Sequence, residues 1–190
     1  MCSDSRVPDR LEPRRAALVV IDLQDRFRGL IHGLDQVLAG TKRLIEFCRI
    51  LRIPIVVTEH YPRGLGETIN ELRLLFDDFA PVEKIHFSCW GDDGFQRKLA
   101  ALRRDQIILC GIEAHVCVYQ TACDLLRAGK QVAVALDAVS SCRAADREIG
   151  LARMSAVGVQ NMGVQMLMFE LLNRAGTDDF KAVKHLLRTE

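Results

Sequence analysis

Residues 16–22 read Ala-Ala-Leu-Val-Val-Ile-Asp, an unbroken apolar run that ends in a carboxylate. A run without polar alternation is typical of a strand buried on both faces, as in a parallel sheet. Similar runs occur at residues 53–58, 106–111 and 131–137, and weaker ones at 82–86 and 159–162. These segments predict the strands of one sheet.

Amphipathic segments separate the strands. From Leu34 to Leu51, apolar residues recur at three- and four-residue steps, the pattern of a helix with one buried face. Further helices are expected at residues 93–104, 115–128, 144–156, 164–174 and 178–187, and a turn-rich loop at 61–66. This alternation predicts an α/β domain whose parallel sheet carries helices on both faces.

The composition indicates one globular domain, expected over residues 16–190, with 49% hydrophobic and 27% charged residues. Residues 1–15 mix arginines with acids and prolines, so we expect a loosely ordered N-terminal arm rather than a targeting signal. The net charge is +1, and no apolar run is long enough to cross a bilayer. We therefore expect neither nucleic acid nor membrane as a partner.

The seven cysteines are odd in number, and no two have the C-x-x-C spacing that zinc frameworks and thioredoxin-like motifs require. Without an export signal, the thiols are expected to be reduced and the protein cytoplasmic. Most buried cysteines act as small hydrophobic residues. The question is whether one of them is reactive.

Three chemically active side chains stand at the predicted strand ends. Asp22 ends the first strand, Lys84 lies near the end of the third, and Cys117 follows the fourth at the start of a helix. Ligands of open α/β sheets bind outside the carboxyl ends of the strands. This places an acid, a base and a thiol at one edge, although each alone has a plainer interpretation as a cap, a solvated charge or a packing residue.

Together they suit nucleophilic catalysis. A free thiol is only a few per cent ionised at neutral pH, and a lysine about 4 Å away favours the thiolate by a few kcal/mol. We expect Lys84 to stabilise a Cys117 thiolate and Asp22 to move the proton. Backbone N–H groups at the helix start, including that of Cys117, would hold an oxyanion.

Three segments carry a family resemblance. Residues 17–27 (ALVVIDLQDRF), Lys84 and residues 110–118 (CGIEAHVCV) resemble the isochorismatase-like cysteine hydrolase superfamily, which includes nicotinamidases, N-carbamoylsarcosine amidohydrolases and isochorismatases. Residues 58–66 (TEHYPRGLG) further resemble the isochorismatase-domain-containing subgroup. The resemblance implies a six-stranded parallel sheet of order 3-2-1-4-5-6 in a three-layer αβα domain, and assembly into a homo-oligomer.

The resemblance also implies site residues: a triad of Asp22, Lys84 and Cys117, and a cis peptide between Ile112 and Glu113. The bend would aim the N–H of Glu113 at the same oxyanion as the N–H of Cys117. Nicotinamidases share a D-x-H metal segment after the second strand, where this chain has Thr58-Glu-His-Tyr. No metal and no cofactor are expected.

The expected activity is hydrolysis of a small amide or carbamoyl compound through a Cys117 thioester. Candidate pocket residues are Gln24, Phe27, Glu59 and Trp90, and both Phe27 and Trp90 have equally good interpretations as packing residues. His115 is a weaker candidate base because residues two apart on a helix point to different sides. Two alternatives stay open: a non-catalytic oligomeric binding or scaffold module, and a hydrolase of an ester or vinyl ether.

Overall fold

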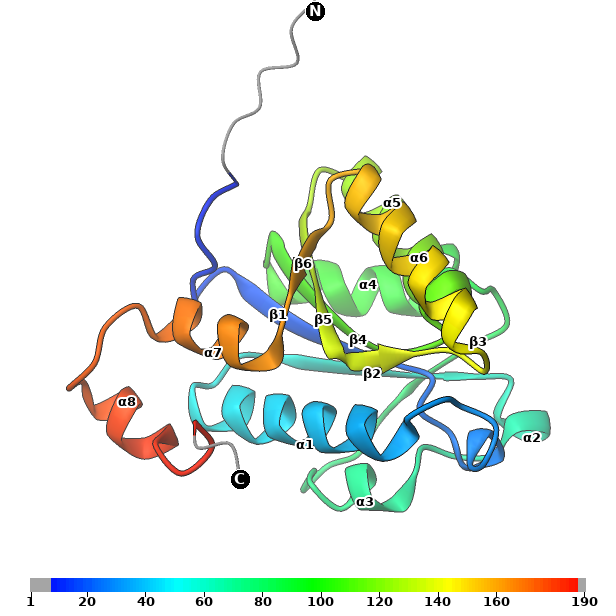
Figure 1. Ribbon diagram of the computed structural model, residues 1–190, viewed down its shortest axis with the longest axis horizontal. Coiled ribbons are helices and arrows are strands. Elements are labelled where there is room, and N and C mark those ends of the chain that lie inside the picture. The colour runs from blue at the N-terminus through cyan, green and yellow to red at the C-terminus, as the bar shows by residue number, and fades with distance from the viewer. Residues whose placement is uncertain (1–7, 188–190) are drawn as a thin grey trace, which may run out of the picture.

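The computed structural model describes residues 8–187 as a three-layer αβα sandwich (Figure 1). All six strands are parallel and run in the order β3-β2-β1-β4-β5-β6, which confirms the expected topology. The strands are β1 (Ala16–Ile21), β2 (Ile55–His60), β3 (Val82–Lys84), β4 (Gln106–Ile112), β5 (Gln131–Ser140) and β6 (Gln160–Met162).

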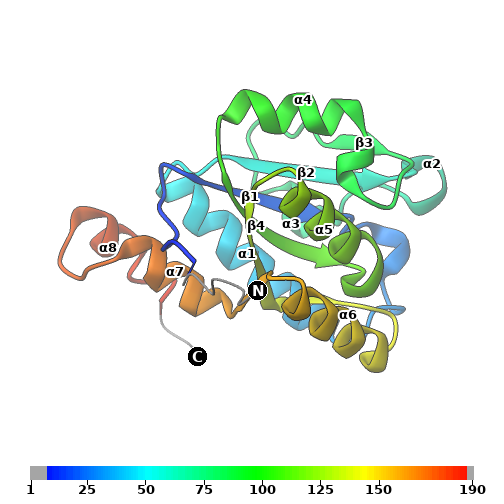
Figure 2. The same ribbon diagram turned by 90° about the horizontal axis from the view of Figure 1, so that it is seen from above.

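Helices cover both faces of the sheet (Figures 1 and 2). One face carries α1 (Leu34–Ile50), α3 (Asn70–Arg73), α7 (Val164–Leu172) and α8 (Asp178–Val183), and the other carries α4 (Asp93–Leu102), α5 (Tyr119–Arg127) and α6 (Ala144–Ala156). Within residues 8–187, no helix has the length and apolar character that a bilayer crossing demands.

The central strands form the core because both of their faces are covered. Every residue of β1 and β4 is buried, as the unbroken apolar runs predict. The expected loose arm is corrected in part: Leu11 is buried, and the backbone N–H of Glu12 donates to the Gln106 side chain at 2.7 Å. Residues 8–15 therefore pack against the domain, and residues 1–7 lie outside the described chain.

Three local elements differ from the expectation. β2 continues through Glu59 to His60, and the segment after it contains the short helix α2 (Pro62–Leu65) instead of a loop. The helix expected from residue 115 begins as a π-helical turn, η3 (Ala114–Val118), before α5 follows. Short 3₁₀ turns, η1 (Asp25–Phe27) and η2 (Cys89–Gly91), also escaped the sequence pattern because they are shorter than one helical period.

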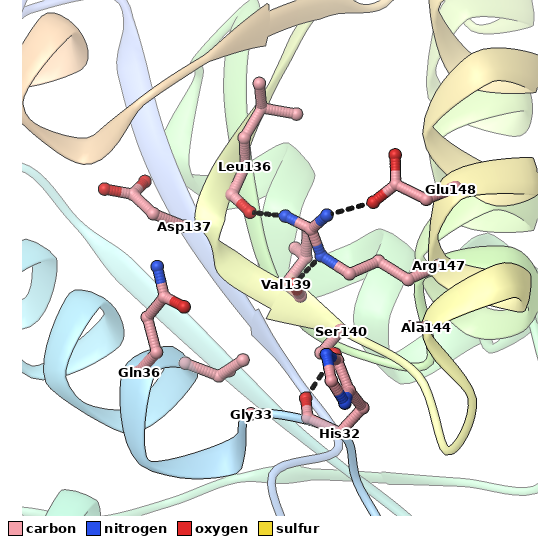
Figure 3. Close-up of a pocket in the computed structure, with 11 residues that line it drawn as sticks. His32, Gly33, Gln36, Leu136, Asp137, Val139, Ser140, Ala144, Arg147 and Glu148 are labelled. Carbon is pink, nitrogen blue, oxygen red and sulfur yellow. Dashed lines mark hydrogen bonds and ion pairs between the residues drawn. The ribbon is translucent and has the colours of Figure 1, made fainter.

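A bulge interrupts β5 beside α6. The pairing with β4 moves from Leu109↔Val134 to Gly111↔Val139, which leaves extra β5 residues outside the ladder. The Arg147 guanidinium donates to the carbonyls of Leu136 and Val139, so a side chain replaces the missing ladder partners (Figure 3). A cavity of about 170 Å³ lies here and contains none of the residues expected for the site.

Candidate functional site

The parallel register brings four strand ends to one edge of the sheet. Ile21 pairs with Thr58 on one side and with Gly111 on the other, and His60 pairs with Lys84. The residues that follow or end these strands therefore meet at the carboxyl edge. This edge is where the strand order reverses between β1 and β4, as expected for an open α/β sheet.

Asp22 leaves the end of β1 in an unusual backbone conformation. Its φ is +52°, in the left-handed region that non-glycine residues occupy rarely and mostly at turns or strained functional sites. The side chain is buried, and its Oδ1 accepts a hydrogen bond from the Thr58 hydroxyl at 2.7 Å. Thr58, which sequence reasoning did not single out, thus orients the carboxylate.

Lys84 contacts the other oxygen of Asp22. Its Nζ lies 2.6 Å from Asp22 Oδ2 and also donates to the carbonyls of His86 at 3.2 Å and Phe87 at 3.4 Å. These three contacts occupy all three ammonium donors. Burial is the largest single influence and lowers the pKa of Lys84, but the charge and hydrogen bond of Asp22, together with the nearby Cys89 and Cys117, raise the pKa above its ordinary value. Lys84 therefore stays a cation.

Cys117 lies in the π-helical turn after β4 and is buried, with 7% of its surface exposed. The chain enters this turn through Gly111 and through a cis peptide bond between Ile112 and Glu113. Gly111 has a φ of +112°, and a Cβ there would lie 2.0 Å from the Ile21 carbonyl oxygen. Only glycine lets β4 pass so close to β1 at this point.

One cavity of about 230 Å³ joins Asp22 and Cys117. Phe27 also lines it, as expected, and so do Ile112 and Glu113, which were expected at the oxyanion; the residues that the sequence analysis missed are His60, Leu65, Phe87 and Val116. Lys84 lies behind Asp22 and does not line the cavity. The cavity walls are mostly apolar, and its polar groups gather around the carboxylate and the thiol.

The other three expected pocket residues lie elsewhere. Gln24 is fully buried, and its amide bonds the backbone of His60 and Gly66. Glu59 points to the opposite side of β2, where one carboxylate oxygen accepts from both the N–H and the hydroxyl of Thr68 at 2.7 Å. Trp90 contributes nothing to the cavity lining. These assignments to the pocket are wrong, and all three residues hold loops in place or pack against the core.

The alternation of side chains along a strand predicts that His60, and not Glu59, faces the cavity. Successive side chains of β2 point to opposite faces, so His60 shares the side of Thr58 while Glu59 does not. His60 lines the cavity, and its ring stacks on Phe87 with a centroid separation of 5.4 Å. Burial, and next the Lys84 charge, lower the pKa of His60 below its ordinary value, so the imidazole is neutral at pH 7.

The electrostatics of the thiol differ from the expectation. Burial, and then the negative charge of Asp22, raise the pKa of Cys117 above its ordinary value, and the opposing effect of Lys84 is smaller. The expected resting thiolate stabilised by Lys84 is therefore wrong, because burial and the charge of Asp22 outweigh the effect of the ammonium. The thiol is protonated at rest, and the Asp22 carboxylate, which lines the same cavity, is the nearby acceptor for its proton.

The other candidate base, His115, has a structural partner. The Nδ1 atom of His115 lies 3.0 Å from the Ser141 hydroxyl, and His115 does not line the cavity. Within residues 8–187, no three His, Cys, Asp or Glu side chains are grouped so that they could hold a metal ion. The arrangement that the structure does provide is a carboxylate and a thiol facing one cavity, with an ammonium behind the carboxylate.

We expect Gly150→Ala to impair the site without altering any cavity residue. Gly150 lies in α6, and a Cβ there would come within 2.8 Å of the backbone of Ala114 and His115. Although alanine favours a helix by about 1 kcal/mol over glycine, overpacking costs about 1–3 kcal/mol and moves the turn that carries Cys117. Denaturant unfolding and the alkylation rate of Cys117 would show both effects. Ile149→Ala, exposed on the same helix, is the control, and equal behaviour of the two variants would contradict the prediction.

Known proteins share this sequence and fold. The isochorismatase domain family matches residues 16–166. The secreted isochorismatase effector Isc1 of Phytophthora sojae is 37% identical and aligns over 94% of this chain and 87% of its own. The MAR1 ribonuclease structure from Caenorhabditis elegans is 36% identical, with a TM-score of 0.88 and coverage of 94% and 92%. YcaC from Pseudomonas aeruginosa, solved with hexane-2,5-diol and covalent acrylamide, is 25% identical, with a TM-score of 0.87 and coverage of 96% and 93%.

Proposed function

Because the chain belongs to the isochorismatase domain family, whose members include hydrolases, we propose that it hydrolyses a small amide or carbamoyl compound with Cys117 as nucleophile. The observation that carries the proposal is the shared cavity of Asp22 and Cys117, with Lys84 2.6 Å behind the carboxylate. An acid–base group and a thiol facing one cavity are the minimum set for acyl transfer to sulfur.

In the first half-reaction, Cys117 attacks the carbonyl carbon while its proton moves to Asp22. The new C–S bond converts the carbonyl into an oxyanion, which the backbone N–H groups of Glu113 and Cys117 stabilise. The oxyanion then re-forms the carbonyl, the C–N bond breaks, and Asp22 gives its proton to the leaving amine. The products are a free amine and a Cys117 thioester.

Water completes the cycle. Asp22 takes a proton from a water molecule that attacks the thioester carbon, and the C–S bond breaks to release the acid. The sulfur recovers a proton from Asp22. Lys84 takes no proton in this scheme; its positive charge holds Asp22 in place and balances the carboxylate in the buried site.

The size and chemistry of the cavity support a small substrate. About 230 Å³ accommodates a compact organic molecule but not a nucleic acid strand, so the proposed substrate is a small molecule and not the RNA that the name of the Caenorhabditis elegans relative implies. The covalent acrylamide in YcaC is a small amide held in a related fold. An ester or a vinyl ether is the alternative substrate class. An acyl adduct on Cys117 is expected from an amide or an ester but not from a vinyl ether.

The direct test is to trap the intermediate. The enzyme is mixed with small amides, carbamoyl compounds and esters, quenched in acid during turnover, and digested for mass spectrometry. The expected result is an added acyl mass on the peptide that contains Cys117, and the loss of that mass in Asp22→Asn, which cannot move the proton. Turnover with no acyl adduct on Cys117, in any quench interval, would overturn the mechanism.

The raised pKa of Cys117 gives a pH prediction. A raised pKa means that the proton is held more tightly, so the thiolate fraction stays small at neutral pH and grows tenfold per pH unit below the pKa. We expect the rate of Cys117 alkylation by iodoacetamide to keep rising from pH 6 to 9. A plateau beginning near pH 7 would show that the thiol ionises at neutral pH and would contradict the prediction.

We also propose that the chain forms a homo-oligomer and works in a reducing compartment. The apolar side chains of Met166 and Phe169 are exposed on α7, where a second copy could cover them. The six cysteines of residues 8–187 are free thiols, which is consistent with a cytoplasmic location. The competing function, a non-catalytic module, is disfavoured by the cavity that the thiol shares with the Asp22 carboxylate, and sedimentation with activity measurements would separate the two.

A further inference from the structure

The charges around the cavity are unbalanced. Asp22 is neutralised by Lys84, but the half-buried Glu113 at the same cavity has no Lys or Arg partner among residues 8–187. The Glu113 carboxylate accepts a hydrogen bond from the N–H of Cys142 at 2.8 Å, and the Cys142 thiol, whose pKa is raised by burial and by Glu113, lies beside it. Neither group carries a positive charge, so the negative charge of this cavity-lining residue has no cationic partner.

No positive group offsets this charge from within the cavity. Within the described chain, neither lysine nor arginine contributes to the lining. Besides Asp22 and Glu113, the titratable side chains of the lining are His60 and Cys117. His60 is neutral at pH 7 because burial and the nearby ammonium disfavour its charged form. A substrate carboxylate would therefore lose its hydration and meet a like charge with no cation to pair with.

The remaining walls favour apolar groups. Phe27, Leu65, Phe87, Ile112 and Val116 surround the space next to the sulfur. Apart from the thiol and the backbone N–H groups proposed for the oxyanion, the imidazole of His60 is the uncharged lining group that could hydrogen-bond a substrate carbonyl or amide, since it can donate or accept. The pocket thus offers an apolar wall, a neutral polar edge and an acid.

From these contacts we propose that the site selects an acyl group without charge and rejects carboxylate-bearing substrates, with Glu113 as the residue that sets this selectivity. The inference rests on the proposed function for its substrate class, a small uncharged amide with an apolar acyl chain. It excludes dicarboxylates such as isochorismate, after which the family is named. Glu113 acts on specificity through its side chain, whereas the oxyanion contact uses its backbone N–H.

Two reagents of equal size test the selectivity without turnover. Iodoacetamide and iodoacetate differ in charge but transfer nearly isosteric groups to sulfur, with iodide as the leaving group. The rate constant of each with Cys117 is measured at pH 8.5 by mass spectrometry and divided by its rate constant with glutathione. We expect a normalised preference for iodoacetamide of about 100-fold, equivalent to about 2.7 kcal/mol.

Two variants move the preference in a way that a merely tight pocket would not. Glu113→Gln keeps the size and the backbone N–H but removes the charge, and should lower the preference at least fivefold. His60→Lys adds a cation to the lining and should lower it further or reverse it. Both readouts are ratios within one variant, so a general loss of reactivity does not affect them.

The same contrast can be measured in turnover. Isovaleramide and malonamate are amides that differ in an isopropyl group against a carboxylate, and we expect the former to have the higher kcat/KM by a similar factor. Equal normalised alkylation rates, or a preference for iodoacetate, would overturn the selectivity. If amides are not hydrolysed but the alkylation preference stands, the proposed function fails and the charge selectivity survives.

Discussion

Cys117→Ala is expected to lower hydrolysis by about 10⁴-fold or more, because no other group in the cavity can form the covalent intermediate. The fold should survive the change. Cys117 borders a cavity rather than a packed core, so losing its sulfur creates little new void and costs about 1 kcal/mol or less. Turnover of the best amide and the midpoint of denaturant unfolding are the two measurements.

Cys110→Ala is the matched control for this variant. Cys110 lies seven residues earlier in β4, is fully buried, and has its sulfur 3.8 Å from the Val19 carbonyl oxygen instead of facing the cavity. The control should lose at least as much stability as Cys117→Ala and keep its activity. Comparable activity in the two variants would mean that sulfur chemistry at position 117 is not used.

Lys84→Met is expected to have the largest effect on stability. The change leaves the Asp22 carboxylate buried without its counter-charge, and removing one partner of a buried ion pair costs about 3–5 kcal/mol. It also frees the carbonyls of His86 and Phe87, which lose their donor. The free energy of unfolding should fall by that amount and hydrolysis should be lost, as measured by denaturant titration and amide turnover.

A double variant separates the charge effect from the packing effect. Lys84→Met combined with Asp22→Asn removes both charges, so we expect it to regain most of the lost stability and none of the activity. Arg143→Met is the control for a surface pair: its contact with Asp146 at 2.7 Å is exposed on the arginine side and should contribute less than about 1 kcal/mol. An additive double variant would show that the two buried charges are not coupled.

The fold was predictable because its signals are local and strong. Strands β1 and β4 are apolar at nearly every position, and such runs are hard to reconcile with anything but a sheet covered on both faces. The rule for strand ends then predicts a site at Asp22, Lys84 and Cys117. Two of the three line one cavity, and the third is bonded to the first.

The pocket lining was less predictable because it depends on distant contacts and on parity along a strand. Gln24 was a natural candidate beside Asp22, but its amide is hydrogen-bonded to the backbone of His60 and Gly66. Ending the second strand at Thr58 hid the alternation that sends Glu59 away from the site and His60 into it. Leu65 comes from a helix of four residues, too short to leave a periodic signal.

The ionisation of the thiol could not be read from residue types. An ammonium and a thiol near one edge predict a thiolate, whereas in the structure the ammonium is paired with a carboxylate that lines the same cavity as the thiol. That carboxylate forms an ion pair with Lys84 and, with burial, raises the pKa of Cys117. The sign of the shift thus depends on the order of three groups in space, which sequence separation does not encode.

The contacts that hold Lys84 bear on how substrate range can change during evolution. Two of its three donors bind the backbone carbonyl groups of residues 86 and 87. These hydrogen bonds therefore do not depend on which side chains those positions carry. Phe87 lines the cavity, yet replacing its ring leaves the hydrogen bond from Lys84 to its carbonyl in place. New specificities can therefore arise by single substitutions along this segment. An insertion or deletion there would instead remove the carbonyl partners that hold the Lys84 ammonium beside Asp22.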